Sequence, residues 1–220
     1  SLHKLMLDLR ILQSPAVGEW AEPFRERQVG SSAMPFKRNP ITAEKVDSLA
    51  RWIAALPRVA WDNAALAVLE RTLDDSANRR VTLAEAFLAA DEIVEASAGV
   101  LRDLRLFPDV IARNLATFGA FAAIERVLMA LVSAGADRQE MHERLRQHSL
   151  AAWAEMGRTG RNPLCEMLGR DEAITRYIGV ASIGELMDVT PHVGDAPEWA
   201  RRLAHLIGAR LEQRGRSAGE

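Results

Sequence analysis

Apolar residues recur along this chain at the three- and four-residue spacing of amphipathic helices. In residues 1–12, Leu2, Leu5, Leu9 and Leu12 fall on one helical face. Alternating runs of β-branched residues, which indicate strands, are absent from the sequence, and Tyr177 is its only tyrosine. The pattern therefore predicts an all-α fold.

Helical signals continue after Pro40, where Thr42 is a candidate N-cap and Pro57 is expected to kink or end the helix. Residues 71–80 are polar, which predicts an interruption between two helices. An alanine-rich pattern from 83 to 104 then predicts a long helix suited to close packing in a bundle. On or near one face of this helix lie Ala86, Phe87, Ala90, Ile93 and Val94.

The organisation changes near Leu106. Long helices precede this point, and shorter segments punctuated by glycines follow it. An amphipathic helix is expected over 198–213. We therefore divide the chain into residues 1–105 and residues 106–220.

Composition narrows the class of protein. The chain has 220 residues, of which 48% are hydrophobic and 26% charged, so a sizeable core is expected. A net charge of −2 gives no overall attraction for nucleic acid or an anionic membrane. Cys165 is the single cysteine, CxxC and HExxH motifs are absent, and we find neither a signal peptide nor an apolar run of about 18 residues. We expect a soluble cytoplasmic protein without a metal or cofactor. The helical pattern that starts at Ser1 without an initiator Met also predicts a piece of a longer protein.

The most informative stretch is Gly30-Ser-Ser-Ala-Met-Pro-Phe-Lys-Arg-Asn-Pro40. Small residues let the backbone approach a ligand closely, and the two prolines restrict the loop. Ser31 or Ser32 can exchange a proton, while Lys37 and Asn39 can stabilise an oxyanion. The simpler alternative is a Gly/Ser turn with a basic flank. A Walker A loop is excluded because the GK[ST] ending is missing.

This stretch resembles the signature of the fumarase/aspartase superfamily, GSS-x-MP-x-K-x-NP. Its residues are most similar to those of the adenylosuccinate lyase family. The segment Glu70-Arg-Thr-Leu-Asp-Asp-Ser-Ala-Asn-Arg-Arg80 is similar to that family's nucleotide-phosphate segment. Further similarities are found at Phe107-Pro108, Arg138-Gln139 and His142-Glu143. Asp195 departs from the Gly-Arg-Ala-Pro loop of the family, which puts a basic contact there in doubt.

The resemblance implies a fold and an assembly. Residues 1–105 would be part of the central long-helix bundle, with a signature loop at 27–40, and residues 106–220 a smaller C-terminal helical domain. It also implies a homotetramer whose active sites each draw on three subunits. The implied activity is β-elimination of fumarate from adenylosuccinate, giving AMP, and from the succinyl-carboxamide imidazole ribotide of purine biosynthesis.

The resemblance also assigns roles within the signature. Ser31 matches the catalytic base, and Ser32 beside it would donate a hydrogen bond. Lys37 and Asn39 match residues that hold the substrate. Met34 is expected to be a packing contact with the substrate.

Four further residues match family site positions. Glu44 matches an acid that partners the family's general-acid histidine, although an acid in the first turn of a helix is also favoured by the dipole alone. Arg71, Ser76 and Arg80 match positions that bind the nucleotide phosphate. The alternative is a solvated connection in which Asp74 and Asp75 pair with the arginines.

The five histidines lie outside the segments that match the family's catalytic histidine motifs, so each is expected to be a surface or structural residue. They are His3, His142, His148, His192 and His205. We therefore expect the isolated chain to lack the general acid and to be inactive. Two alternatives stay open: a carboxymuconate cycloisomerase-type relative, whose substrate has no phosphate, and a non-catalytic helical oligomerisation module.

Overall fold

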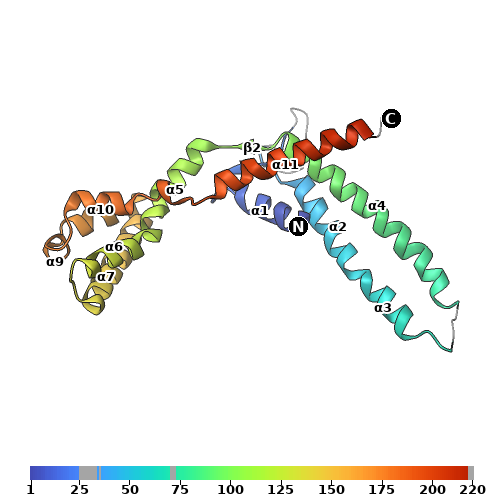
Figure 1. The fold of residues 1–220 in the computed structure, drawn as a ribbon, viewed down its shortest axis with the longest axis horizontal. Helices are drawn as coiled ribbons and strands as arrows, with labels where there is room; N and C mark the ends of the chain where they lie inside the picture. The colour runs from blue at the N-terminus through green and yellow to red at the C-terminus, as the bar shows by residue number, and fades with distance from the viewer. Residues whose placement is uncertain (25–33, 35, 70–72, 218–220) are drawn as a thin grey trace. The chain divides into compact units, whose positions relative to one another are not determined.

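The computed structural model describes residues 1–24, 34, 36–69 and 73–217 and divides the chain into two compact units (Figure 1). Unit 1 comprises Ser1–Ile111 and unit 2 comprises Ala112–Glu220. Regular structure in the described residues is almost entirely helical, which confirms the all-α prediction. The division that the sequence predicts, after residue 105, falls ahead of the boundary between the units.

Unit 1 is built from helices and one short β-ribbon. Its elements are α1 (Leu2–Leu12), β1 (Trp20–Ala21), α2 (Ile41–Ala55), α3 (Pro57–Ala65), α4 (Asp75–Arg102), β2 (Arg105–Leu106) and the start of α5 (Pro108–Ala122). The two strands pair antiparallel, with Trp20 opposite Leu106 and Ala21 opposite Arg105. This ribbon brings the segment before the signature next to the end of α4.

The core of unit 1 lies where α2 packs against α1 and α4. Its buried apolar members are Met6, Leu9, Ala43, Val46, Ile93 and Val100. Each helix contributes residues spaced by three or seven positions, as one face of a helix requires. Asp47 is buried close to them on α2 and forms an ion pair with Arg10 at 2.8 Å.

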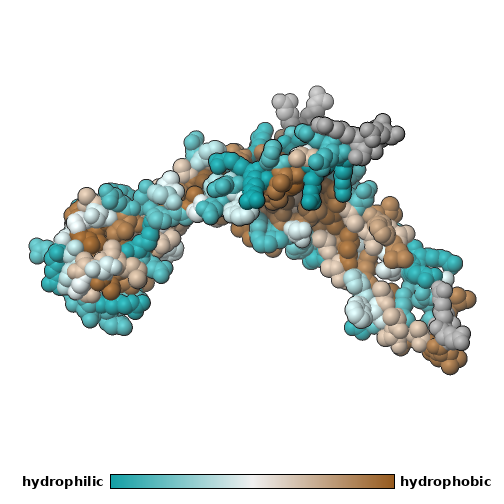
Figure 2. Space-filling view, viewed as in Figure 1, coloured by the Kyte–Doolittle hydropathy of each residue, from teal (hydrophilic) through white to brown (hydrophobic). Residues whose placement is uncertain are grey.

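Beyond this core, α2–α3 and α4 continue side by side as a long hairpin (Figure 1). Pro57 begins α3 directly after Leu56, as the sequence predicts. Along α4, Ile93 is buried, whereas Phe87 is 76% exposed and Val94 is 57% exposed. Figure 2 shows hydrophobic residues on the surface of this hairpin.

Helix α4 also begins earlier than the sequence predicts. Residues 75–80, which read as part of a polar interruption, are its first helical residues. Asp75 lies in the first turn, where the helix dipole favours an acid, and it pairs with Arg79 one turn later at 3.2 Å. Local charge pairing thus makes this polar sequence helical.

Unit 2 contains the rest of α5 and a second helical core. Its further elements are α6 (Ile124–Ser133), α7 (Arg138–Thr159), α8 (Leu164–Gly169), α9 (Glu172–Thr175), α10 (Val180–Met187), the 3-10 helix η1 (Thr190–His192) and α11 (Ala196–Ser217). Helices α6, α7, α8 and α10 pack together. The core they enclose includes Val127, Leu131, Met141, Leu164 and Ile183, all fully buried.

One described stretch, Pro108–Ser133, is long and apolar enough to cross a membrane by length and composition alone. The expectation that no such stretch exists is therefore wrong. In the structure the stretch is two helices, α5 and α6, and Ala123, Val127 and Leu131 from it are buried in the core of unit 2. Of its most apolar window, 28% is buried inside the protein, and a single stretch of this kind is weak evidence for a membrane span.

Candidate functional site

The signature stretch is described at Met34 and from Phe36 onward, while Ser31 and Ser32 lie outside the described residues. The Lys37 N–H donates to the Met34 carbonyl at 3.0 Å, which forms a turn. Met34 and Lys37 are exposed, and Asn39 is half-buried. Lys37 therefore ends a short turn, and Asn39 follows it two residues later, directly before Pro40 and the start of α2.

Helix α2 begins without a cap from its own sequence. The residue at the N-cap position is Pro40, and no side chain there accepts a helix N–H. The predicted N-cap, Thr42, lies inside the helix and is one of the donors that need a partner. The carboxylate of Glu22 supplies it, accepting the N–H of Thr42 at 3.1 Å and that of Ala43 at 3.1 Å.

A cavity of about 390 Å³ lies in unit 1 beside the described part of the signature. Aromatic rings line it together with polar and cationic side chains and one carboxylate: Trp20, Phe24, Phe36, Phe107, Gln13, Lys37, Arg38, Asn39, Arg105 and Glu22. Such a mixed lining suits a ligand with both apolar and anionic parts. Lys37 and Asn39 therefore border a hollow that can hold a small molecule.

Glu44 lies in the first turn of α2 and is exposed. Its N–H donates to the carbonyl of Pro40 at 2.9 Å. The helix dipole favours an acid at this position, and exposure leaves the carboxylate accessible to a group from outside this unit. Both sequence interpretations of Glu44 are compatible with this placement.

The predicted phosphate-binding residues lie at the start of α4, apart from Arg71, which is outside the described residues. Ser76 is half-buried and Arg80 is exposed, one helical turn apart on the same face. The neighbouring Arg79 pairs with Asp75, which is the pairing expected if this segment is a solvated connection. A cavity of about 350 Å³ between α3 and α4 is lined by Asp75 and Arg79, and Ser76 and Arg80 are not among its described lining residues.

The two groups of candidate residues are far apart within unit 1. Lys37 and Asn39 precede α2, whereas Ser76 and Arg80 begin α4 at the other end of the hairpin. Residues 41–65 separate the two ends as nearly continuous helix, which at roughly 1.5 Å per residue spans on the order of 30 Å. One copy of the chain does not bring the two groups together.

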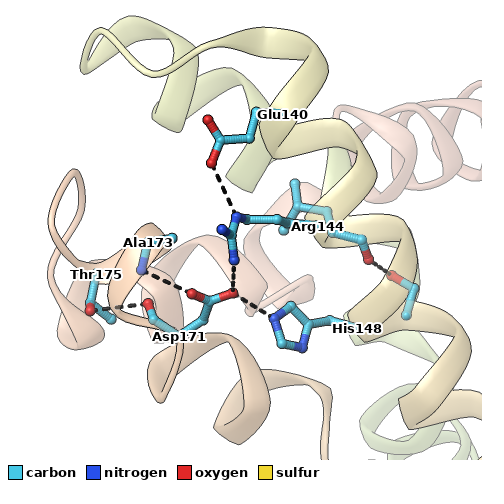
Figure 3. Close-up of polar contacts among 8 residues, drawn as sticks. Glu140, Arg144, His148, Asp171, Ala173 and Thr175 are labelled. Carbon is cyan, nitrogen blue, oxygen red and sulfur yellow. Dashed lines mark hydrogen bonds and ion pairs between the residues drawn. The ribbon is translucent and has the colours of Figure 1, made fainter.

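A polar cluster in unit 2 was not predicted as a unit (Figure 3). His148 Nε2 lies 2.8 Å from Asp171 Oδ2, and Arg144, which also pairs with Glu140, lies 3.4 Å from the same oxygen. Burial alone would raise the pKa of Asp171, but the bonds from His148 and the Ala173 N–H, with the charge of Arg144, outweigh it and lower that pKa. The spacing of Glu140, Arg144 and His148 at every fourth residue of α7 was the available sequence signal.

This cluster joins α7 to the start of α9, where Asp171 also accepts the N–H of Ala173 at 2.9 Å as the N-cap. Its contacts are all within unit 2 and mutually satisfied, so we assign it a structural role. Within the described ranges, three or more His, Cys, Asp or Glu side chains nowhere come together as a metal site would require.

Two protein-family models match the chain. The model described as "Lyase" matches residues 1–54, and the model described as "Adenylosuccinate lyase C-terminus" matches residues 121–203. The first match contains the signature stretch, and the second contains most of unit 2.

Curated relatives are named adenylosuccinate lyase. The chain is 44% identical over 173 residues to that of Schistosoma mansoni, covering 78% of this chain and 36% of the relative. It is 40% identical to that of Saccharomyces cerevisiae (91% and 41% covered) and 35% identical to that of Pyrococcus horikoshii (98% and 46% covered). The chain thus spans less than half the length of these relatives.

Solved structures share the fold. The 3-carboxy-cis,cis-muconate lactonizing enzyme of Pseudomonas putida superposes with a TM-score of 0.74 at 24% identity, covering 91% of this chain and 43% of that one. A fumarate lyase from Mesorhizobium gives a TM-score of 0.72 at 24% identity, with 89% and 41% covered.

Proposed function

We propose, on the premise that this chain belongs to the adenylosuccinate lyase family of the fumarase/aspartase superfamily, that it is the C-terminal part of a lyase of purine biosynthesis. The enzyme would release fumarate from adenylosuccinate to give AMP, and from the succinyl-carboxamide imidazole ribotide. The observation that carries this proposal is the intact signature: a serine pair followed by Lys37 and Asn39 at the entrance to α2.

The proposed step is a β-elimination. A base takes the proton from the carbon next to a carboxylate, and the electron pair left behind forms the double bond of fumarate as the carbon–nitrogen bond breaks. A general acid protonates the leaving nitrogen. We assign the base to Ser31, whose hydroxyl needs activation by neighbouring donors or cations to accept a proton at neutral pH.

Negative charge accumulates on the substrate carboxylate as the proton leaves. Lys37 and Asn39 are suited to stabilise it, since an ammonium and an amide N–H held close to the developing charge act most strongly there. Their position at the rim of the 390 Å³ cavity supports this role. Ser32 and Met34 would complete the contacts around the substrate.

The nucleotide phosphate would be held by Arg71, Ser76 and Arg80. A guanidinium gives two parallel hydrogen bonds to a phosphate, and a hydroxyl adds a third donor. Arg80 and Ser76 share one face at the N-terminal end of α4, where the helix dipole also favours an anion. A carboxymuconate substrate has no phosphate for these residues to bind.

The distance between the two groups supports a site assembled from several copies. On the order of 30 Å separates Lys37 from Ser76 along the hairpin, which is longer than a nucleotide substrate. We therefore propose a cytoplasmic homotetramer in which one copy supplies the signature and another supplies the phosphate group. The general acid, partnered by Glu44, would come from the N-terminal half that the relatives possess, so the 220-residue chain alone would be inactive.

Adenylosuccinate cleavage by the full-length polypeptide tests this proposal. We expect activity, with a loss of at least about 10²-fold in Ser31→Ala because the base is removed. We also expect AMP binding, measured by calorimetry, to weaken in Arg80→Ala and not in Arg102→Ala at the other end of α4. A folded full-length protein that neither cleaves adenylosuccinate nor binds AMP would favour the cycloisomerase or the non-catalytic module.

A further inference from the structure

Glu22 is a carboxylate buried in unit 1, with 2% of its surface exposed. Its oxygens accept N–H groups from the first turn of α2: Thr42 at 3.1 and 3.3 Å and Ala43 at 3.1 Å. The usual source of such bonds is the side chain at the helix N-cap, which is Pro40 here. A residue 20 positions earlier therefore fixes where α2 begins.

Gln13 extends this contact to the signature itself. Its Oε1 accepts the N–H of Glu22 at 2.8 Å, and its Nε2 donates to the carbonyl of Arg38 at 3.1 Å. The guanidinium of Arg38 also lies over the ring of Phe24, 5.1 Å from the ring centre. We call these contacts the clamp; its members are Gln13, Glu22, Phe24, Arg38, Thr42 and Ala43.

The clamp holds the chain on both sides of Asn39. Arg38 is fixed immediately before it, and Thr42 and Ala43 are fixed immediately after Pro40 and Ile41. Lys37 lies one residue outside the clamped segment, and Glu44 follows it directly. Three of the proposed site residues therefore lie within the clamped segment or directly beside it.

The burial of a carboxylate here is costly. Removal from water raises the pKa of Glu22 above its usual range, even though the N–H groups of Ala43 and Thr42 act in the opposite direction. Serine, threonine, aspartate or asparagine at position 40 would cap the helix without this cost. The bonds from Glu22 add something that a local cap cannot, because they tie the start of α2 to the segment directly after β1.

We propose that Glu22 is a positioning residue for the lyase reaction, acting with Gln13 to hold Lys37, Asn39 and Glu44 in register. This inference rests on the proposed function. Glu22 also lines the cavity of about 390 Å³, and in this proposal it acts through the segment it holds.

The test compares variants of the full-length protein by steady-state kinetics and by amide hydrogen exchange over residues 36–46. Glu22→Ala removes the acceptors, and we expect kcat per folded site to fall by about 10²-fold, because a misplacement of about 1 Å has that effect. The amides of Thr42 and Ala43 should exchange faster. Glu22→Gln keeps one acceptor oxygen and should restore most of both properties.

A second variant tests the clamp if Glu22→Ala does not fold, and a third serves as the control. Gln13→Met preserves volume but removes both bonds of Gln13, and should lower kcat by about 10-fold, the effect of losing about 1.4 kcal/mol in the transition state. Glu92→Ala removes an exposed ion pair to Lys45 of α2 and should leave kcat and exchange unchanged.

Faster exchange at Thr42 and Ala43 with kcat within about threefold of wild type would overturn the positioning role, since a factor of three is only about 0.7 kcal/mol. Unchanged exchange in Glu22→Ala would overturn the clamp itself. A wild-type protein without lyase activity would instead overturn the proposed function, and with it the assignment of Glu22 to that reaction. The exchange data would then still report whether the clamp exists.

Discussion

Individual side chains at the candidate site differ in how they are held. Lys37 is exposed at a turn, whereas Glu22 is buried and accepts hydrogen bonds from two backbone groups. The first kind of residue can reach a ligand, and the second fixes the geometry behind it. The residues expected to touch substrate are recognisable by type, but those that position them are found only through their long-range contacts.

Asp171 offers a test of how one half-buried acid stabilises unit 2. Asp171→Asn keeps the cap on Ala173 but loses the ion pair with Arg144 and the bond between the carboxylate and His148, and we expect it to lower the free energy of unfolding by about 1–3 kcal/mol at pH 7. The folded-state pKa of Asp171 is lowered, so its contribution is complete above the ordinary aspartate pKa and is lost as pH falls through the folded value.

Urea unfolding at pH 7 and near pH 3 measures this effect. The difference between wild type and Asp171→Asn should shrink at the lower pH. Glu166→Gln, which removes an exposed ion pair with Arg161, is the matched control and should change stability little at either pH. A difference for Asp171→Asn that does not depend on pH would contradict the assigned ion pair.

Helices and their ends show which structural features could be predicted from the sequence. Local periodicity correctly predicted the helices around α1, α2 and α4, because amphipathic spacing and proline positions act within a few residues. The Thr42 cap was wrong because Glu22 approaches from 20 residues away. Ile93 of α4 is buried while Phe87 is exposed, a difference that was not predictable because hydrophobic periodicity indicates an apolar face without indicating what covers it.

The two short strands were also beyond local reasoning. Trp20-Ala21 and Arg105-Leu106 are each too short to give an alternating pattern, and they pair across more than eighty residues. The signature predicted the residue types of the candidate site. It did not predict the clamp, since neither Gln13 nor Glu22 belongs to a motif that indicates its partners.

The packing of α5 against the segment after α10 offers a further test, of the stability of unit 2. A Cβ added at Gly119 would lie 2.6 Å from Cγ2 of Val189, closer than real atoms approach. Gly119→Ala should therefore lower the free energy of unfolding by about 1–3 kcal/mol, measured by urea unfolding. Because Val189→Ala removes the clashing methyl group, the double variant should recover most of this loss, and failure to recover would contradict the proposed contact.

For the molecule as a whole, unit 1 exposes hydrophobic residues that its own core does not use. Trp61 of α3 is 74% exposed, Phe87 of α4 is 76% exposed, and Leu73 in the connection between these helices is 78% exposed. Soluble monomers rarely leave so many large apolar side chains in water along one element. This exposure, like the separation of Lys37 from Arg80, supports a site completed by other copies.

Mixing two inactive variants of the full-length protein tests this central claim most directly. Lys37→Ala removes the signature lysine and Arg80→Ala removes the phosphate arginine, and each alone should lose activity. If the two groups come from different copies, dissociating and reassembling the variants together creates some sites with both residues intact. We predict that adenylosuccinate cleavage returns in the mixture; a mixture no more active than its two components would contradict a site shared between chains.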